Sequence, residues 1–135
     1  MIIFLIHSLL IPYFLLTNDD NDYHDFYYSL LTALGPEEAN KQLRRHWRTW
    51  VTEKEILSLK ASGLDTLRIP VGDWMYAPYG PFVGCMDGAL DELNRVLRLC
   101  EKHDLKAVLD IHAMKGSQVR SILSILSILF ILSCY

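Results

Sequence analysis

The sequence has few of the features that mark a metal-binding, disulfide-linked or nucleic-acid-binding protein. Its three cysteines are widely spaced, with no Cys-x-x-Cys pair and no histidine at ligand spacing, so they indicate neither a zinc site nor a disulfide framework. No Asn-x-Ser/Thr sequon is present, so glycosylation gives no argument for secretion. The net charge of -3 leaves no basic surface for nucleic acid, and we exclude that class of partner.

Apolar residues make up 51% of the chain and are concentrated at its two ends. Residues 1–33 are predicted to be an apolar leader followed by an acidic linker, and the leader is either a secretory signal or anchor or a non-native start. Residues 119–135 contain the triplet Ser-Ile-Leu three times and are predicted to be a low-complexity apolar tail, with a short membrane anchor as the alternative. A membrane is therefore a candidate partner through these ends.

Between the ends, the pattern predicts an α/β fold. Residues 64–71 and 105–112 are short apolar runs typical of buried strands, and residues 87–103 repeat apolar side chains at helical spacing. A strand, a crossover helix and a second strand form a βαβ unit with parallel strands. Two further helices, at 34–50 and 52–63, are predicted to precede this unit.

Local signals define these helices further. Pro36 is predicted in the first turn of one helix, while Thr52 and Glu55 form a capping box at the start of the next, which ends before Gly63. The predicted buried side chains are Ala39, Leu43 and Trp47 in the first helix, and Ile56, Leu57 and Leu59 in the second. In the crossover helix the polar face, which is predicted to be exposed, comprises Asp91, Glu92, Arg95, Arg98 and Glu101.

Polar residues interrupt both predicted strands. Because side chains alternate between the two faces of a strand, Arg68 is predicted to point away from the helices, as are Asp110 and His112. A buried arginine needs a carboxylate partner, so we predict a contact between Arg68 and Asp110. Asp73, Asp110 and His112 are too weak a pattern to predict a metal site.

The loop after the first strand, residues 72–84, is rich in aromatic residues, glycine and proline. Loops that leave the carboxyl ends of strands often carry function in α/β folds. Exposed rings such as those of Trp74 and Tyr79 would suit the apolar faces of sugars. The alternative is that these rings pack the loop onto the domain, and the composition leaves both interpretations open.

Several motifs carry a more specific signal, and all of them lie within residues 34–118. They are Leu-Gly-Pro-Glu-Glu-Ala-Asn from Leu34, Arg-His-Trp from Arg45, Leu-Arg-Ile-Pro-Val-Gly-Asp-Trp from Leu67, Pro-Tyr-Gly-Pro from Pro78, Leu-Asp-Ile-His-Ala from Leu109 and Lys-Gly-Ser-Gln from Lys115. In these motifs the chain resembles the exo-β-1,3-glucanases of glycoside hydrolase family 5, in the fungal and oomycete style.

The resemblance implies a (β/α)8 TIM barrel and a retaining glycosidase that hydrolyses β-1,3-glucan from its non-reducing end. Such an enzyme uses two glutamates about 5 Å apart, needs no cofactor, and acts outside the cell or in the cell wall. By the family's pattern, Arg68 is the second-strand arginine that hydrogen-bonds the nucleophile. His112 is the third-strand histidine that lines the subsite of the cleaved sugar, and the other candidate site-lining residues are Asp110, Trp74 and Tyr79.

The resemblance covers only the second and third strands of the barrel with their helices. The family's catalytic glutamates lie on its fourth and seventh strands, and Glu92 and Glu101 are predicted on a covering helix, so no catalytic residue is assigned in this chain. We therefore predict a partial TIM barrel, a glucanase fragment without activity as written. The alternative is a small membrane-associated or glucan-binding remnant without hydrolase activity.

Overall fold

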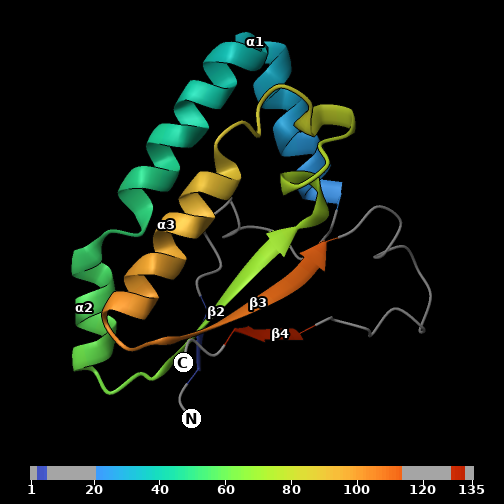
Figure 1. Cartoon of the computed structure of the whole chain (residues 1–135). Coiled ribbons are helices and arrows are strands. Elements are labelled where there is room, and N and C mark those ends of the chain that lie inside the picture. Colours follow the sequence, from blue (N-terminus) through green and yellow to red (C-terminus); the bar gives the residue numbers. More distant parts are fainter. Residues whose placement is uncertain (1–2, 6–20, 114–128, 133–135) are drawn as a thin grey trace.

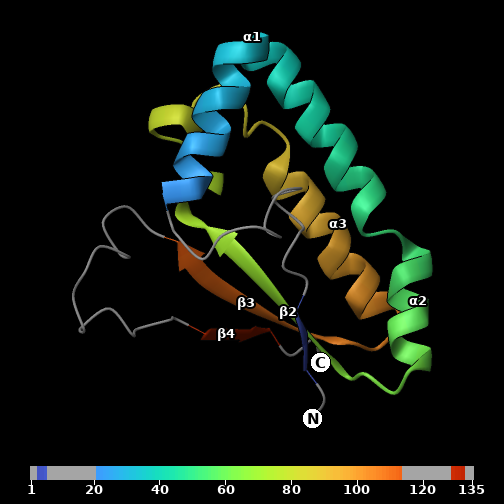
Figure 2. The same ribbon diagram turned by 180° about the vertical axis from the view of Figure 1, so that it is seen from behind.

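The computed structural model describes residues 3–5, 21–113 and 129–132, with side-chain detail for residues 26–111. Three helices lie together on one side of a small sheet (Figures 1 and 2). The elements, in chain order, are β1 (Ile3–Leu5), α1 (Asn21–Trp50), α2 (Glu53–Ala61), β2 (Thr66–Gly72), the short 3-10 helices η1 (Asp73–Met75) and η2 (Gly80–Phe82), α3 (Ala89–Lys102), β3 (Lys106–Ala113) and β4 (Leu129–Leu132).

The sheet has the strand order β1-β2-β3-β4. Strands β2 and β3 pair in parallel from Thr66 opposite Lys106 to Val71 opposite Ile111, with α3 as their crossover. The predicted βαβ unit and the α/β class are therefore confirmed. The sheet also contains two strands that were not predicted, β1 parallel to β2 and β4 antiparallel to β3. Both come from the apolar ends, and they pair with edges that a two-stranded sheet would leave open.

Helix α1 differs from the predicted helix because it begins at Asn21 rather than near residue 34. It consists of two halves that meet at a sharp bend (Figure 1), where Gly35 has a φ of 76° and a ψ of 163°. Glycine adopts this left-handed region without steric cost, and Pro36 then starts the second half as predicted. Part of the stretch predicted as an acidic linker is thus helical, and Tyr27 within it is fully buried.

The helical core follows most of the predicted pattern. Ala39, Leu43 and Trp47 are all at most 3% exposed, and Ile56 is fully buried, so these predictions are confirmed. The prediction for Leu57 is wrong, because its side chain is 48% exposed. Leu57 follows Ile56 by one residue, which rotates it about 100° around the helix and away from the core.

The capping signals of α2 are confirmed. The backbone N–H of Thr52 donates to the carboxylate of Glu55 over 3.0 Å, and a capping box is formed. The Thr52 hydroxyl, which also donates to this carboxylate, and the Thr52 backbone N–H together hold the pKa of the Glu55 carboxyl below its usual value. Gly63 follows the helix with a φ of 84°, the left-handed conformation expected after a helix end.

Glu92 contradicts the prediction of an exposed polar face on α3, because it is only 8% exposed. Its carboxylate accepts hydrogen bonds from Arg48 on α1 at 3.1 Å and from Arg95 on α3 at 2.6 Å. Arg95 also donates to the backbone carbonyl of Val51 at 2.8 Å. Helix α1 covers this side of α3, and the sequence of α3 alone gives no sign of that neighbour.

The membrane predictions concern the two ends of the chain, most of which lie outside the described residues. Within the described helices, none is both long and apolar enough to cross a bilayer. The predicted leader at residues 1–16 and the predicted tail at residues 119–135 lie, apart from β1 and β4, outside the described residues.

Candidate functional site

The candidate site lies where β2 and β3 end. Parallel strands bring their carboxyl ends to one edge of a sheet, and ligands of α/β folds bind beyond that edge. Leu67, Ile69 and Val71 of β2 are at most 2% exposed and pack into the helical core. Arg68 alternates with them and therefore lies on the opposite face of the sheet.

Arg68 and Asp110 form an ion pair across the two strands. The Nη2 group of Arg68 donates to Oδ2 of Asp110, which confirms the predicted contact. Arg68 pairs with Val108 and Asp110 with Pro70 in the strand register, so both side chains stand on the same face. Asp110 is fully buried, whereas the Arg68 side chain is 32% exposed. The pair therefore fixes a buried carboxylate beneath a partly accessible guanidinium.

His112 lies at an irregularity of the sheet. Val71 is opposite Ile111, but the next residue, Gly72, is opposite Ala113, so β3 has one extra residue at His112. Such β-bulges recur beside active sites, where they redirect a side chain. The side chain of His112 lies outside the described part, and its role in the site stays a prediction.

Trp74 is the first aromatic residue of the loop after β2, and it packs inward. Its ring is 5% exposed and stacks on Phe82, with centroids 4.3 Å apart and planes inclined by 5°. A Cβ atom at Gly72 would overlap the indole, so the glycine leaves room for the ring. The expectation of an exposed ring is wrong for Trp74, and the packing alternative holds. Whether Trp74 lines a sugar site stays a prediction.

Tyr79 is half-buried and hydrogen-bonded within the same loop. Its hydroxyl donates to Oδ1 of Asp73 over 2.9 Å. Partial burial, together with the neighbouring carboxylate, raises the pKa of Tyr79 to about 12, so the hydroxyl stays protonated at neutral pH. No cluster of three histidine, cysteine or acidic side chains that could hold a metal occurs among the described residues.

Comparison with curated proteins identifies the segment. It is 40% identical over 93 residues to a glucan 1,3-beta-glucosidase of Pichia angusta and 39% identical over 93 residues to one of Blumeria graminis. The chain is homologous to a segment of the glucan 1,3-beta-glucosidases. Both alignments cover 67% of this chain and 21% of the relative. A relative from Schwanniomyces occidentalis is 34% identical over 103 residues, which cover 75% of this chain and 24% of the relative.

The glucanase resemblance inferred from the motifs is thereby confirmed at the level of the glucan 1,3-beta-glucosidases. No family model matches the chain. The chain spans about a fifth of the length of the first two relatives.

Tyr76 is a candidate sugar-contacting residue that the sequence alone did not distinguish from the other aromatic residues of the loop. It follows η1 and is 59% exposed, whereas Trp74 and Phe82 in the same loop are at most 5% exposed. The composition of the loop treats all these rings alike. Only their packing separates the two buried rings, which support the loop, from the ring that faces solvent.

The glutamates of this glucanase homologue all lie on helices α1, α2 and α3. The prediction that Glu92 and Glu101 lie on a covering helix is therefore confirmed. Glu92 is enclosed between two arginines, which is a structural role. The carboxylates near the strand ends are aspartates, Asp110 on β3 and Asp73 just after β2.

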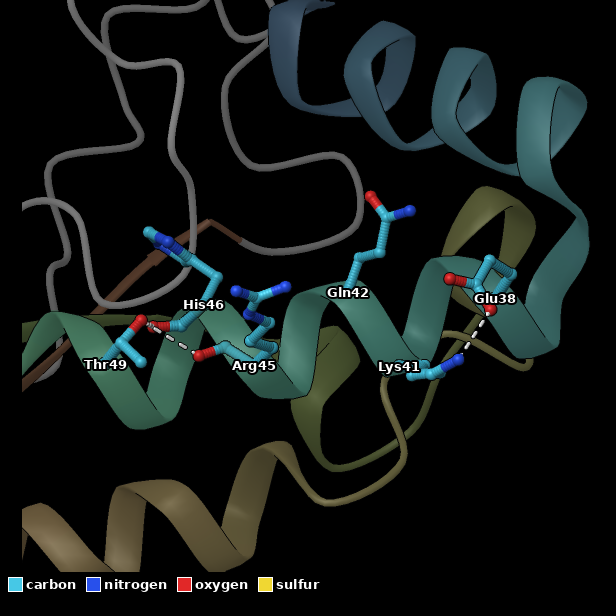
Figure 3. Close-up of a pocket in the computed structure, with 6 residues that line it drawn as sticks. All are labelled: Glu38, Lys41, Gln42, Arg45, His46 and Thr49. Carbon is cyan, nitrogen blue, oxygen red and sulfur yellow. Dashed lines mark hydrogen bonds and ion pairs between the residues drawn. The ribbon is translucent and has the colours of Figure 1, made fainter.

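An open groove of about 740 Å³ runs along α1 and is lined by Glu38, Lys41, Gln42, Arg45, His46 and Thr49 (Figure 3). Its lining residues in the described part of the chain all come from that helix, and Lys41 pairs with Glu38 over 3.3 Å. None of the described side chains of β2 or β3 lines the groove. It is a depression in a charged helix surface and gives no support for a glucan site at the strand ends.

Proposed function

We propose that this chain forms the second and third βα units of a glucan 1,3-β-glucosidase barrel of glycoside hydrolase family 5, which hydrolyses β-1,3-glucan. The observation that supports this most directly is the Arg68–Asp110 pair, which joins two parallel strands on the face opposite the helices. It occurs in a segment with up to 40% identity to glucan 1,3-beta-glucosidases. Charged pairs on that face are expected where a barrel binds its substrate.

The proposed chemistry is that of a retaining glycosidase. One glutamate attacks the anomeric carbon while another protonates the leaving oxygen, and water then releases the sugar from the enzyme. Arg68 would hydrogen-bond the nucleophile, because a neighbouring guanidinium stabilises the ionised form of a carboxylate. His112 and Tyr79 would line the subsite of the cleaved sugar, and the buried Trp74 would support the loop beside it.

This chain supplies sugar-binding and orienting groups and no catalytic pair. Its glutamates lie on helices, so by itself it binds β-glucan and does not cleave it. The reaction requires no metal or cofactor. Because a polymeric glucan does not cross membranes, the enzyme would act outside the cell or in the cell wall.

A segment exchange tests the proposal. Residues 34–118 replace the matching segment of the Pichia angusta relative, and glucose release from laminaritriose is measured. We expect the chimera to retain activity and Arg68→Ala in the chimera to lose about a hundredfold in kcat, as when one charge-stabilising group is removed. The complete 135-residue chain alone is expected to release no glucose.

Far-ultraviolet circular dichroism checks that each chimera is folded. A folded chimera that is inactive on laminaritriose, or that prefers the β-1,4-linked cellotriose, would show that residues 34–118 do not belong to a β-1,3-glucanase site. Glucose release by the chain alone would contradict the assignment of the catalytic pair to other strands.

A further inference from the structure

Among the residues with described side chains, two buried carboxylates, Glu92 and Asp110, pair with arginines, and the two arginine environments differ. Glu92 is held between Arg48 and Arg95, and Arg95 also donates to the Val51 carbonyl. Both Nε and Nη2 of the Arg95 guanidinium are therefore hydrogen-bonded within the protein, where they hold α3 against the end of α1. Glu92 therefore has a structural environment, in which Arg95 is bonded to Glu92 and to the backbone.

The Asp110 carboxylate has a different arrangement. It is fully buried, and its arginine partner, Arg68, is 32% exposed and makes one side-chain hydrogen bond within the described residues, through Nη2. A guanidinium has five N–H donors in a rigid, planar fork. Fixing one corner of that fork on a buried carboxylate sets the directions of the remaining donors.

We propose that Asp110 is a positioning residue of the glucan site, which orients Arg68 without touching the substrate. It holds the guanidinium on the sheet face so that the other N–H groups are available to the nucleophilic carboxylate of the complete enzyme and to a bound glucosyl unit. This inference rests on the proposed function. It assigns Asp110 a role distinct from that of Arg68, which contacts the ligand.

The physical reason is preorganisation. A free arginine side chain loses rotamer freedom when it binds a ligand, and that loss weakens binding. Asp110 imposes this loss during folding, because its buried carboxylate is stabilised by the charge of Arg68. Removing the charge but not the volume of Asp110 should therefore release Arg68 while leaving the strand in place.

The test uses the complete chain with Asp110→Asn and two readouts. The first is the Nε–Hε resonance of Arg68 in an arginine-labelled NMR spectrum, which reports directly on whether the guanidinium is held. The second is the Kd for laminaritriose. We expect Asp110→Asn to collapse the Arg68 resonance to the position of a mobile arginine and to raise Kd about tenfold, because a charge-assisted hydrogen bond no longer holds the donor.

Glu92→Gln is the matched control, since it neutralises the other buried carboxylate on α3. It is expected to lower thermal stability while leaving the Arg68 resonance and the laminaritriose Kd unchanged. An unchanged Arg68 resonance and an unchanged Kd in Asp110→Asn would overturn the inference. If the wild-type chain does not bind laminaritriose, the proposed function fails, and the Arg68 resonance still reports separately on positioning.

Arg68→Lys covers the case in which Asp110→Asn does not fold. Lysine keeps a positive charge opposite Asp110 but has no rigid fork, so one ammonium cannot hold the carboxylate and present fixed donors at the same time. We expect this variant to fold and to bind laminaritriose about tenfold more weakly. Wild-type affinity in Arg68→Lys would contradict the positioning role.

Discussion

Tyr27 and Phe82 join the start of α1 to the loop after β2. Their rings lie 4.9 Å apart with planes inclined by 61°, and both side chains are almost fully buried. The bend at Gly35 turns the first half of α1 back toward this loop (Figure 2). The loop that follows β2 is therefore supported by residues that precede the glucanase resemblance.

We expect Tyr27→Ala to lower the free energy of unfolding by about 3 kcal/mol, because it removes a fully buried ring and leaves a cavity. Urea titration followed by tryptophan fluorescence measures the change. Tyr28→Ala is the matched control, since its side chain is 63% exposed and its loss should cost less than about 0.5 kcal/mol. Equal effects of the two changes would mean that residues 21–34 do not pack on the domain.

The close contact between Gly72 and Trp74 makes a second prediction. A methyl group at Gly72 would overlap the indole, so Gly72→Ala should destabilise the fold by about 1–3 kcal/mol through overpacking. In a Trp74→Ala background the overlap is absent and the same change should cost little. A double-mutant cycle in urea measures the coupling between the two sites. Purely additive effects would show that the indole does not rest on Gly72.

Local sequence signals predicted the features that depend on a few neighbouring residues. Gly35 and Pro36 define a helix start, and Thr52 with Glu55 forms a cap, because backbone conformation and short-range hydrogen bonds decide both. The Arg68–Asp110 contact followed from strand alternation once two parallel strands were inferred. Part of the candidate site is thus predictable from the sequence alone.

Features that depend on distant segments were not predictable in this way. Glu92 is buried because α1 covers it, Leu57 is exposed because none of the described elements covers it, and Trp74 is buried because Phe82 stacks on it. Each outcome depends on which segment lies opposite, and a single helix or loop does not encode that in its own periodicity. The burial of Trp74 matters most for the candidate site, because it leaves Tyr76 as the more exposed aromatic ring of the loop.

Tyr76 and Trp74 should therefore differ in what they do. Tyr76→Ala is expected to reduce retention of the chain on insoluble β-1,3-glucan about tenfold without changing stability, because its exposed ring is available to stack on sugar. Trp74→Ala is expected to lower stability by about 3 kcal/mol through loss of a buried ring. A pull-down and a thermal melt of each variant check both outcomes. Unchanged retention of Tyr76→Ala would remove this ring from the proposed site.

The contact between α2 and α3 is expected to weaken in acid. Glu53 accepts hydrogen bonds from Lys102 at 2.7 Å and lies 2.7 Å from Nε2 of His103, and these partners hold the pKa of its carboxyl below 4.5. Since the folded-state pKa is lowered, the unfolded chain takes up the proton first as the pH falls. The stabilisation by Glu53 is then complete above about pH 4.5 and is lost as the pH falls through the folded-state value.

Glu53→Gln should accordingly lower stability at pH 7 and have a smaller effect at pH 2, because the charge of Glu53 stabilises the folded state less as the pH falls. Urea unfolding at the two pH values measures the difference, and moderate salt should reduce the effect at pH 7 because the pair lies at the surface. His103→Gln provides a second check, since it removes one partner of Glu53 and leaves Lys102 in place. An equal cost of Glu53→Gln at both pH values would mean that the residue acts by packing and not through its charge.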